Sequence, residues 1–172
     1  MPGGTVLDIG GGVGVIHHEL LNRGFAAATH VDQSSAFIDV ARQEAVRNGH
    51  GERVTFVQGD FRAVVRSLAV ADLVTLDRVV CCDADFATLL PLAAQCARRS
   101  LALSFPRDRW FVRLGIWVSN VWRGLRGSDF RVYVHPPVAM GKLLSDIGLR
   151  RVRAASMVVW AIEVWERAPG PP

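Results

Sequence analysis

A short apolar strand that runs directly into four closely spaced glycines constrains this chain more than any other feature. Residues 6–9 read Val-Leu-Asp-Ile, and they are followed by Gly10, Gly11, Gly12 and Gly14. Because glycine lacks a Cβ, the chain can turn tightly there and bring its backbone close to a ligand. Residues 14–23 are typical of a helix that ends at Gly24. The sequence therefore predicts a strand–turn–helix unit with a ligand site at the turn.

An acidic residue after the next apolar run indicates what this ligand contains. Residues 27–31 are predicted to form a second strand, and Asp32 follows them, with Gln33 and Ser34 beside it. A carboxylate in this place can accept hydrogen bonds from both hydroxyls of a ribose. We therefore expect a nucleoside-binding site.

The spacing of the glycines decides between two kinds of nucleoside ligand. A dinucleotide fingerprint needs glycines at its first, third and sixth positions, but the sixth position counted from Gly10 is Val15. The pattern is instead Asp-x-Gly-x-Gly-x-Gly from Asp8 to Gly14. It resembles motif I of class I S-adenosylmethionine-dependent methyltransferases. The resemblance implies S-adenosylmethionine as cofactor, and a carboxylate such as Asp8 suits the sulfonium and ammonium groups of that ligand.

The resemblance continues through the next two strands. Residues 53–57 are followed by Gly59, Asp60 and Phe61, where the family contacts the amino group and ring of adenine. The strand over 72–77 ends at Asp77, where the family places motif IV, which implies a cofactor contact and a catalytic candidate. The alternative is that Asp8, Asp32 and Asp60 are ordinary turn or helix-capping acids.

Strand and helix patterns alternate along most of the chain, which predicts the α/β class. We expect helices over 35–48, 61–68, 85–97 and 136–147 and further strands over 100–105, 149–153 and 157–166. Continuous apolar strands between helices indicate a doubly wound parallel sheet covered on both faces. The last two strands are too close for a crossover and should pair antiparallel. The expected domain is a three-layer, seven-stranded, Rossmann-like sheet over 1–167, followed by a disordered tail at 168–172.

Composition and charge restrict the cellular location and the binding partners that we expect for this chain. The 172 residues are 50% hydrophobic, which suits one globular domain, and no apolar run is long enough to cross a membrane. We expect no signal peptide, and three cysteines predict neither a disulfide framework nor a metal site, so a cytoplasmic location is expected. The net charge is +4, and 12 basic against 3 acidic residues fall in 98–153. This basic segment could attract an anionic substrate, nucleic acid or a membrane surface. The alternative is that it is a solvated basic face.

Residues 108–126 form a second unusual segment, because their apolar side chains recur at helical spacing. The stripe consists of Trp110, Phe111, Leu114, Trp117, Val118, Val121, Trp122 and Leu125. It predicts a lid or wall over an apolar substrate, with Trp110 and Trp117 as contacts and 108–135 as a substrate-region insertion. A helix lying on an anionic membrane and a plain packing helix are the alternatives.

The C-terminal half resembles the magnesium-protoporphyrin O-methyltransferases at residues 101–106, 131–135 and 142–149. That resemblance implies a flat, apolar, carboxylated acceptor. Two features depart from that family's pattern: Cys81-Cys82 replaces a His-Tyr pair, and no helices precede the first strand. The acceptor could therefore differ, the chain could be a truncated or degenerate member, or a partner or second copy could supply the cap.

These patterns together predict a methyltransferase acting on a small, apolar or aromatic molecule. Asp77 and His135 are the catalytic candidates, and Arg78 could hold a substrate carboxylate. His17 and His18 are predicted to lie on a helix surface, and Cys81 and Cys82 to be buried. The alternatives are a nucleic-acid methyltransferase and a non-catalytic cofactor-binding subunit.

Overall fold

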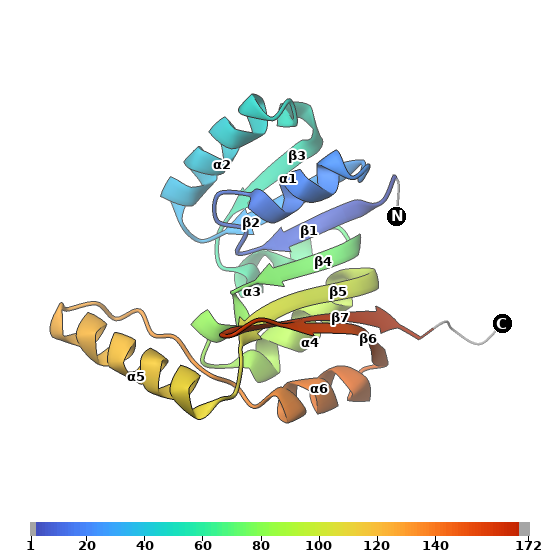
Figure 1. Cartoon of the computed structure of the whole chain (residues 1–172). Coiled ribbons are helices and arrows are strands. Elements are labelled where there is room, and N and C mark those ends of the chain that lie inside the picture. Colours follow the sequence, from blue (N-terminus) through green and yellow to red (C-terminus); the bar gives the residue numbers. More distant parts are fainter. Residues whose placement is uncertain (1–2, 169–172) are drawn as a thin grey trace.

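The computed structural model describes residues 3–168 and contains a seven-stranded sheet (Figure 1). Its strands are β1 (Thr5–Ile9), β2 (Ala27–Asp32), β3 (Val54–Gln58), β4 (Ala71–Asp77), β5 (Ala97–Pro106), β6 (Leu149–Ser156) and β7 (Trp160–Arg167). They lie in the order β3-β2-β1-β4-β5-β7-β6. The pairs among β1 to β5 are parallel, whereas β7 is antiparallel to both β5 and β6. The predicted fold class and the terminal hairpin are confirmed.

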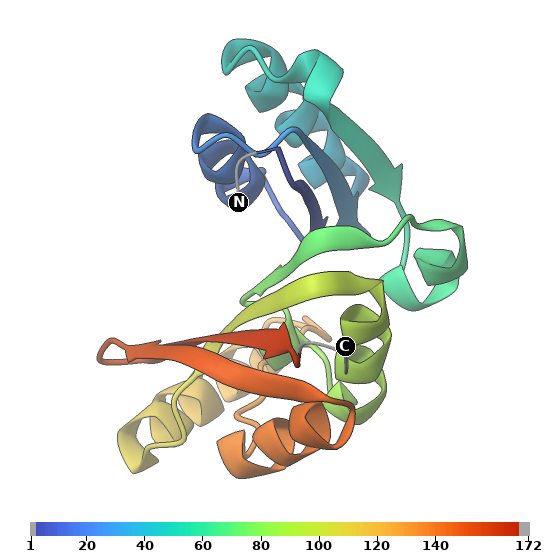
Figure 2. The ribbon, with the colours of Figure 1, turned by 90° about the vertical axis from the view of Figure 1, so that its right-hand side faces the viewer.

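Helices cover both faces of this sheet, which gives three layers (Figure 2). On one face α1 (Val15–Asn22) and α2 (Ser35–Arg47) pack on β1, β2 and β3, and on the other α4 (Phe86–Cys96) and α6 (Pro137–Asp146) pack on β4, β5 and β6. The shorter helical segments are α3 (Phe61–Val64) and the 3-10 turns η1 (Gly51–Arg53), η2 (Val65–Ser67) and η3 (Val80–Cys82).

The apolar strands supply a core on each face, because successive side chains of a strand point to opposite sides. Leu7 of β1 and Val74 of β4 are fully buried in the larger cluster. Their neighbours Val6 and Leu73 belong to the smaller cluster, which includes Phe25 after α1. Both faces of the central strands are therefore buried, as a doubly wound sheet requires.

Strand ends differ from the predicted ends by up to three residues. β5 begins at Ala97, directly after α4, because Ala97 already pairs with Ala71. In the hairpin, β6 continues to Ser156, which pairs with Ala161 of β7. Pairing with a neighbouring strand, and not local hydrophobicity, sets these ends. The predicted tail, apart from Ala168, lies outside the described residues.

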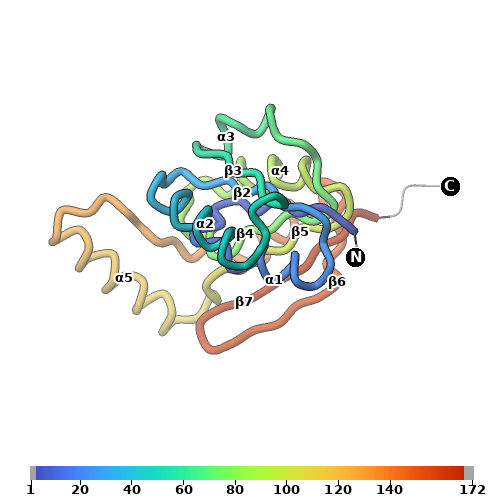
Figure 3. Tube along the Cα trace, turned by 90° about the horizontal axis from the view of Figure 1, so that it is seen from above, coloured from blue at the N-terminus to red at the C-terminus, as the bar shows by residue number. Residues whose placement is uncertain are grey.

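Helix α5 (Trp110–Leu125) projects away from the sheet (Figures 1 and 3). Val112 is the buried residue of this helix, whereas Trp110, Trp117 and Leu125 are 76%, 63% and 79% exposed. The predicted apolar stripe thus faces outward over its whole length. Within residues 3–168, no helix combines the length and apolarity needed to span a bilayer.

Candidate active site

The carboxyl ends of β1 to β4 meet at one edge of the sheet, and Asp32 connects two of them. The Asp32 carboxylate is 9% exposed. Its Oδ2 accepts a hydrogen bond from the Gly12 amide at 3.0 Å, and its Oδ1 accepts from the Ser34 amide at 2.9 Å. Asp32 therefore fixes the glycine loop against the start of α2, where Ser34 is the N-cap residue.

A cleft beside this loop is lined by both predicted adenine contacts, Asp60 and Phe61, and by three other residues predicted to bind the cofactor. Gly10, Gln33, Gly59, Asp60 and Phe61 line it, together with Ile9, Val31, Arg62, Val79, Asp83 and Leu89. Asp60 is exposed and also caps α3, since its Oδ1 accepts from the Arg62 amide at 3.0 Å. The cleft has apolar walls and a carboxylate at its rim, which suits a flat heterocycle with an amino group.

The sequence did not predict the pairing of Arg62 with Asp83, two further residues that line this cleft. Arg62 forms an ion pair with Asp83 at 2.7 Å and donates to the Asp85 carbonyl at 2.9 Å. The hydrogen bond to Asp83 is the largest cause of the raised pKa of Arg62. Because Arg62 and Asp83 belong to different strand–helix connections, no local pattern could have paired them. This clamp holds the loop after β4 next to the loop after β3.

Asp8 lies beneath the glycine loop and not at its surface. Its carboxylate is 1% exposed, and its Oδ1 accepts from the Thr75 hydroxyl at 2.6 Å. Its Oδ2 lies 2.9 Å from Nδ1 of His17. His17 and His18 are both buried, so their predicted surface position on α1 is wrong: α1 packs this side against the sheet. A contact between Asp8 and the cofactor stays a prediction.

Gly14 shows why the loop after β1 needs glycine. It is the N-cap residue of α1, and its φ of 92° lies in the left-handed region that residues with a Cβ rarely adopt. A Cβ there would also lie 2.6 Å from Cε1 of the buried His17. The loop conformation and the packing under it therefore both favour glycine.

The end of β4 places Asp77 and Arg78 side by side. The exposed Asp77 accepts a hydrogen bond from the Ser104 hydroxyl on β5. Arg78 has φ 59°, unusual for a residue other than glycine, and its amide donates to the same hydroxyl oxygen at 2.9 Å. A strained residue at the carboxyl end of a strand is a frequent companion of functional sites.

A second pocket, of about 300 Å³, opens between η3, α5 and the start of β7. It is mostly apolar and is lined by Arg78, Cys81, Cys82, Pro106, Gly115, Ile116, Ser119, Arg123, Val132, Val159 and Trp160. The Arg78 guanidinium lies 4.9 Å from the centre of the Trp160 ring. Nη1 of Arg123 is buried and has no hydrogen-bond partner among the described residues. The pocket thus combines apolar walls with two arginines, Arg78 and Arg123, in its lining.

Cys82 is exposed, so its predicted burial is wrong, whereas Cys81 is buried as expected. The hydrogen bond from Cys81 and, to a smaller extent, the positive charge of Arg123 lower the pKa of the Cys82 thiol to about 7, although burial opposes them. The same contact, together with burial, raises the pKa of Cys81. Cys82 is therefore the more acidic of the two thiols.

His135, a predicted catalytic residue, lies buried under η3. Its Nε2 is 2.8 Å from the Asp83 carbonyl and 3.1 Å from the Val80 carbonyl. Because both partners are acceptors, this nitrogen carries its proton and donates it to the backbone. His135 thus positions the loop after β4, and the Tyr133 ring stacks on it at 5.9 Å.

The predicted substrate contacts on α5 lie away from the second pocket. Its wall on α5 is formed by Gly115, Ile116, Ser119 and Arg123, which lie opposite η3 and the start of β7. Trp110 and Trp117 lie outside that lining and are exposed. Asn120 fixes the returning segment to α5, because its side chain exchanges hydrogen bonds of 2.7 and 3.0 Å with the Val132 backbone.

Comparison with known protein families agrees with this geometry. The family described as "Methyltransferase domain" matches residues 6–101, which include the glycine loop and the strands β1 to β4. This chain belongs to that methyltransferase family. Its fold is that of the class I enzymes, which use S-adenosylmethionine. A search of curated proteins gives no match.

Solved structures share the fold of this methyltransferase at low sequence identity. Magnesium protoporphyrin IX methyltransferase from Synechocystis PCC 6803, with bound S-adenosylhomocysteine, is 24% identical, with a TM-score of 0.79 over 97% of this chain and 75% of that one. An O-methyltransferase family protein from Burkholderia thailandensis is 19% identical, with a TM-score of 0.79 over 97% of this chain and 52% of that one. An O-methyltransferase from Planctomyces limnophilus in complex with apigenin is 17% identical, with a TM-score of 0.75 and the same coverage.

Proposed function

We propose that this methyltransferase transfers the methyl group of S-adenosylmethionine to a small, apolar or aromatic molecule that carries an acidic group. The observation that carries the proposal is the mostly apolar pocket beside β4, which the two arginines Arg78 and Arg123 line. A guanidinium beside apolar walls favours a carboxylate partner. A magnesium protoporphyrin IX methyltransferase and a complex with apigenin among the solved neighbours are compatible with a flat, aromatic acceptor.

The residues at the sheet edge fit the cofactor. Asp32 keeps acceptor capacity beyond its two bonds to amides, since an ionised carboxylate offers about four lone-pair sites. We assign the ribose to Asp32 and the adenine to the cleft lined by Asp60 and Phe61. S-adenosylmethionine supplies an activated methyl group together with its leaving group. The tasks left to this chain are to orient the acceptor and to exclude water.

An acidic acceptor would also make methyl transfer independent of Cys82, whose thiol lines the same pocket. A carboxylate that accepts a methyl group loses no proton, so no general base is required. The Nε2 proton of His135 is committed to backbone carbonyls, and Asp77 accepts from Ser104. In this scheme Arg78 and Arg123 hold the acidic group of the acceptor, and Asp77 lines neither this pocket nor the adenine cleft.

The variant Arg123→Gln tests the acceptor. Methyl transfer to a carboxylated aromatic compound should show a KM raised about tenfold or more, since a charged hydrogen bond is worth about 1.5–3 kcal/mol. Transfer to the corresponding amide should be weak in both proteins. Arg126→Gln, an exposed position on the same helix end, is the matched control. Equal KM values for acid and amide in the wild-type protein would contradict the assignment.

A pH measurement on the free protein checks that Arg123 faces this pocket. The rate of Cys82 alkylation by iodoacetamide should rise with pH around about 7, because only the thiolate reacts. Arg123→Gln removes a positive charge that favours the thiolate, so the midpoint should move to higher pH. An unchanged midpoint would place the guanidinium elsewhere.

We also propose that the outward face of α5 lies on an anionic membrane surface. This face presents Trp110, Trp117 and Trp122, and Arg109, Arg113 and Arg126 are exposed on or next to the same helix. A basic helix with a tryptophan-rich face is typical of interfacial binding. The opposite face walls the acceptor pocket, so an apolar acceptor held in lipid would be close to its site.

Sedimentation with lipid vesicles tests this surface. The protein should bind vesicles that contain phosphatidylglycerol and bind phosphatidylcholine vesicles less, because the arginines add electrostatic attraction that salt screens. Trp117→Ser combined with Trp122→Ser should weaken binding on the order of tenfold per side chain. Val46→Ser on α2, equally exposed and apolar, is the control. Absence of binding to anionic vesicles, or a dimer in ultracentrifugation that the tryptophan variants disrupt, would overturn the membrane assignment.

A further inference from the structure

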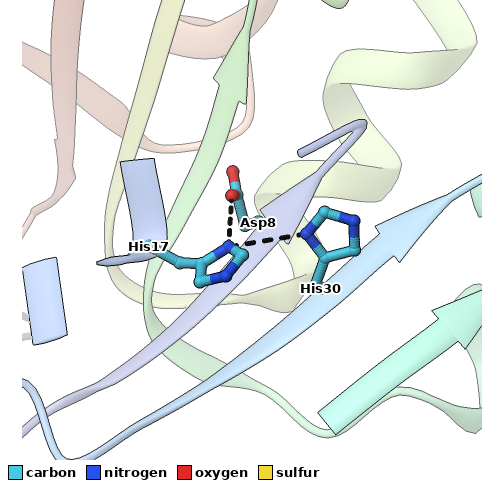
Figure 4. A group of neighbouring side chains, drawn as sticks. All are labelled: Asp8, His17 and His30. Carbon is cyan, nitrogen blue, oxygen red and sulfur yellow. Dashed lines mark hydrogen bonds and ion pairs between the residues drawn. The ribbon is translucent and has the colours of Figure 1, made fainter. Parts of the chain in front are cut away.

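Three buried side chains converge under the glycine loop, one from each of β1, α1 and β2 (Figure 4). Asp8 and His30 are paired residues of adjacent strands, and His17 reaches them from the first turn of α1. Oδ2 of Asp8 lies 2.9 Å from Nδ1 of His17, which lies 3.4 Å from Nδ1 of His30. The three side chains have at most 1% exposure.

Hydrogen bonds within the protein do not account for this group. If Nδ1 of His17 donates to Asp8, it has no lone pair left for His30. An N–H on Nδ1 of His30 would then face another N–H, and an N–H on its Nε2 has no partner within the described part of the chain. With its proton on Nε2, His30 has a lone pair on Nδ1, and this atom lies within 4.8 Å of the ligand atoms of Asp8 and His17, where a cation could bind all three.

We propose that Asp8, His17 and His30 bind a divalent transition-metal ion, and we assign Zn²⁺. Two imidazoles and one carboxylate are a common ligand set for zinc, with a fourth position left open. Tetrahedral nitrogen ligands at about 2.1 Å from zinc lie about 3.4 Å apart, and the two Nδ1 atoms already have this spacing. The contact between Asp8 and His17 would widen by about 0.5 Å. This site is separate from the acceptor pocket and does not depend on the proposed function.

The Thr75 hydroxyl gives the proposed metal site one outer-shell partner, whereas Nε2 of His17 and of His30 has none among the described residues. The second oxygen of Asp8 is held by the Thr75 hydroxyl at 2.6 Å, which fixes the carboxylate as outer-shell partners do in metal sites. An ion there would join β1, α1 and β2 and stiffen the base of the glycine loop.

Zinc titration of the protein without a histidine tag tests the site. After treatment with a chelator, the protein should take up one Zn²⁺ per chain in competition with a chromophoric chelator at pH 7.5. His17→Asn and His30→Asn should each reduce the affinity by about tenfold or more. His50→Asn is the matched control, because this buried histidine contacts His18 and not the three ligands.

Thermal unfolding gives a second readout on the wild-type protein, which does not depend on the variants folding. Zn²⁺ that binds the folded chain should raise the melting temperature in a concentration-dependent way, and EDTA should reverse the shift. No saturable uptake of Zn²⁺ by the wild-type protein would overturn the proposal. Uptake that His17→Asn and His30→Asn both leave unchanged would overturn it as well.

Discussion

Replacing Asp32 with alanine should weaken the binding of S-adenosylmethionine about 10-fold to 100-fold. Each hydrogen bond between a ribose hydroxyl and a carboxylate contributes about 1.5–3 kcal/mol, and the alanine variant loses at least one. The same change also releases the amides of Gly12 and Ser34, so the glycine loop loses its connection to α2. Equilibrium dialysis with labelled cofactor measures the effect.

Two controls separate the loss of ribose contacts from unfolding. Asp39→Ala removes an exposed acid on α2 and should leave cofactor affinity unchanged. Asp32→Asn keeps a side-chain oxygen that can accept a hydrogen bond, so it should bind more tightly than Asp32→Ala and more weakly than the wild-type protein. Wild-type affinity in a folded Asp32→Ala protein would remove the ribose assignment.

Replacing Gly11 with alanine should lower the free energy of unfolding by about 1–3 kcal/mol. An added Cβ would lie 2.5 Å from Nδ1 of His30 and 2.7 Å from Oδ2 of Asp8. Both side chains are fully buried and tied to neighbours, so neither can move without disturbing β1 or β2. Urea unfolding followed by circular dichroism measures the change.

Gly115→Ala is the matched control for this substitution. No atom lies within 4 Å of a Cβ at position 115, which is in the middle of α5. Alanine favours a helix over glycine by about 1 kcal/mol, so this variant should keep or gain stability. A stable Gly11→Ala protein would show that the loop does not pack closely on the Asp8–His17–His30 group.

The sheet and its ligand edge were predictable because they depend on local patterns. Apolar runs predicted the strands β1 to β4. The acids at the carboxyl ends of these strands meet at one edge in any doubly wound sheet. The ends of β5 and β6 were not predictable, since pairing partners such as Ala71 and Ala161 extend those strands. The sequence could place Asp32 and Asp60 but not the clamp between Arg62 and Asp83, which joins two separate connections.

Burial was the property that the sequence predicted least well. Helix α5 lies within the predicted segment 108–126, yet its tryptophan face is exposed and its other side forms the pocket wall. His17 and His18 lie on the packed side of α1, and His30 was overlooked because β2 reads as an apolar strand. One signal in the sequence was present. Asp8 lies two residues before Gly10, and His30 lies two residues before Asp32. Because both strands end at the same edge of a parallel sheet, this equal spacing places Asp8 beside His30.

Calorimetric titration of the chain with S-adenosylmethionine, run beside a titration with NAD, tests the central assignment most directly. The strand-end acids and the glycine loop predict saturable binding of one S-adenosylmethionine per chain and no heat with NAD. Saturable heat with NAD and none with S-adenosylmethionine would contradict the account of this site.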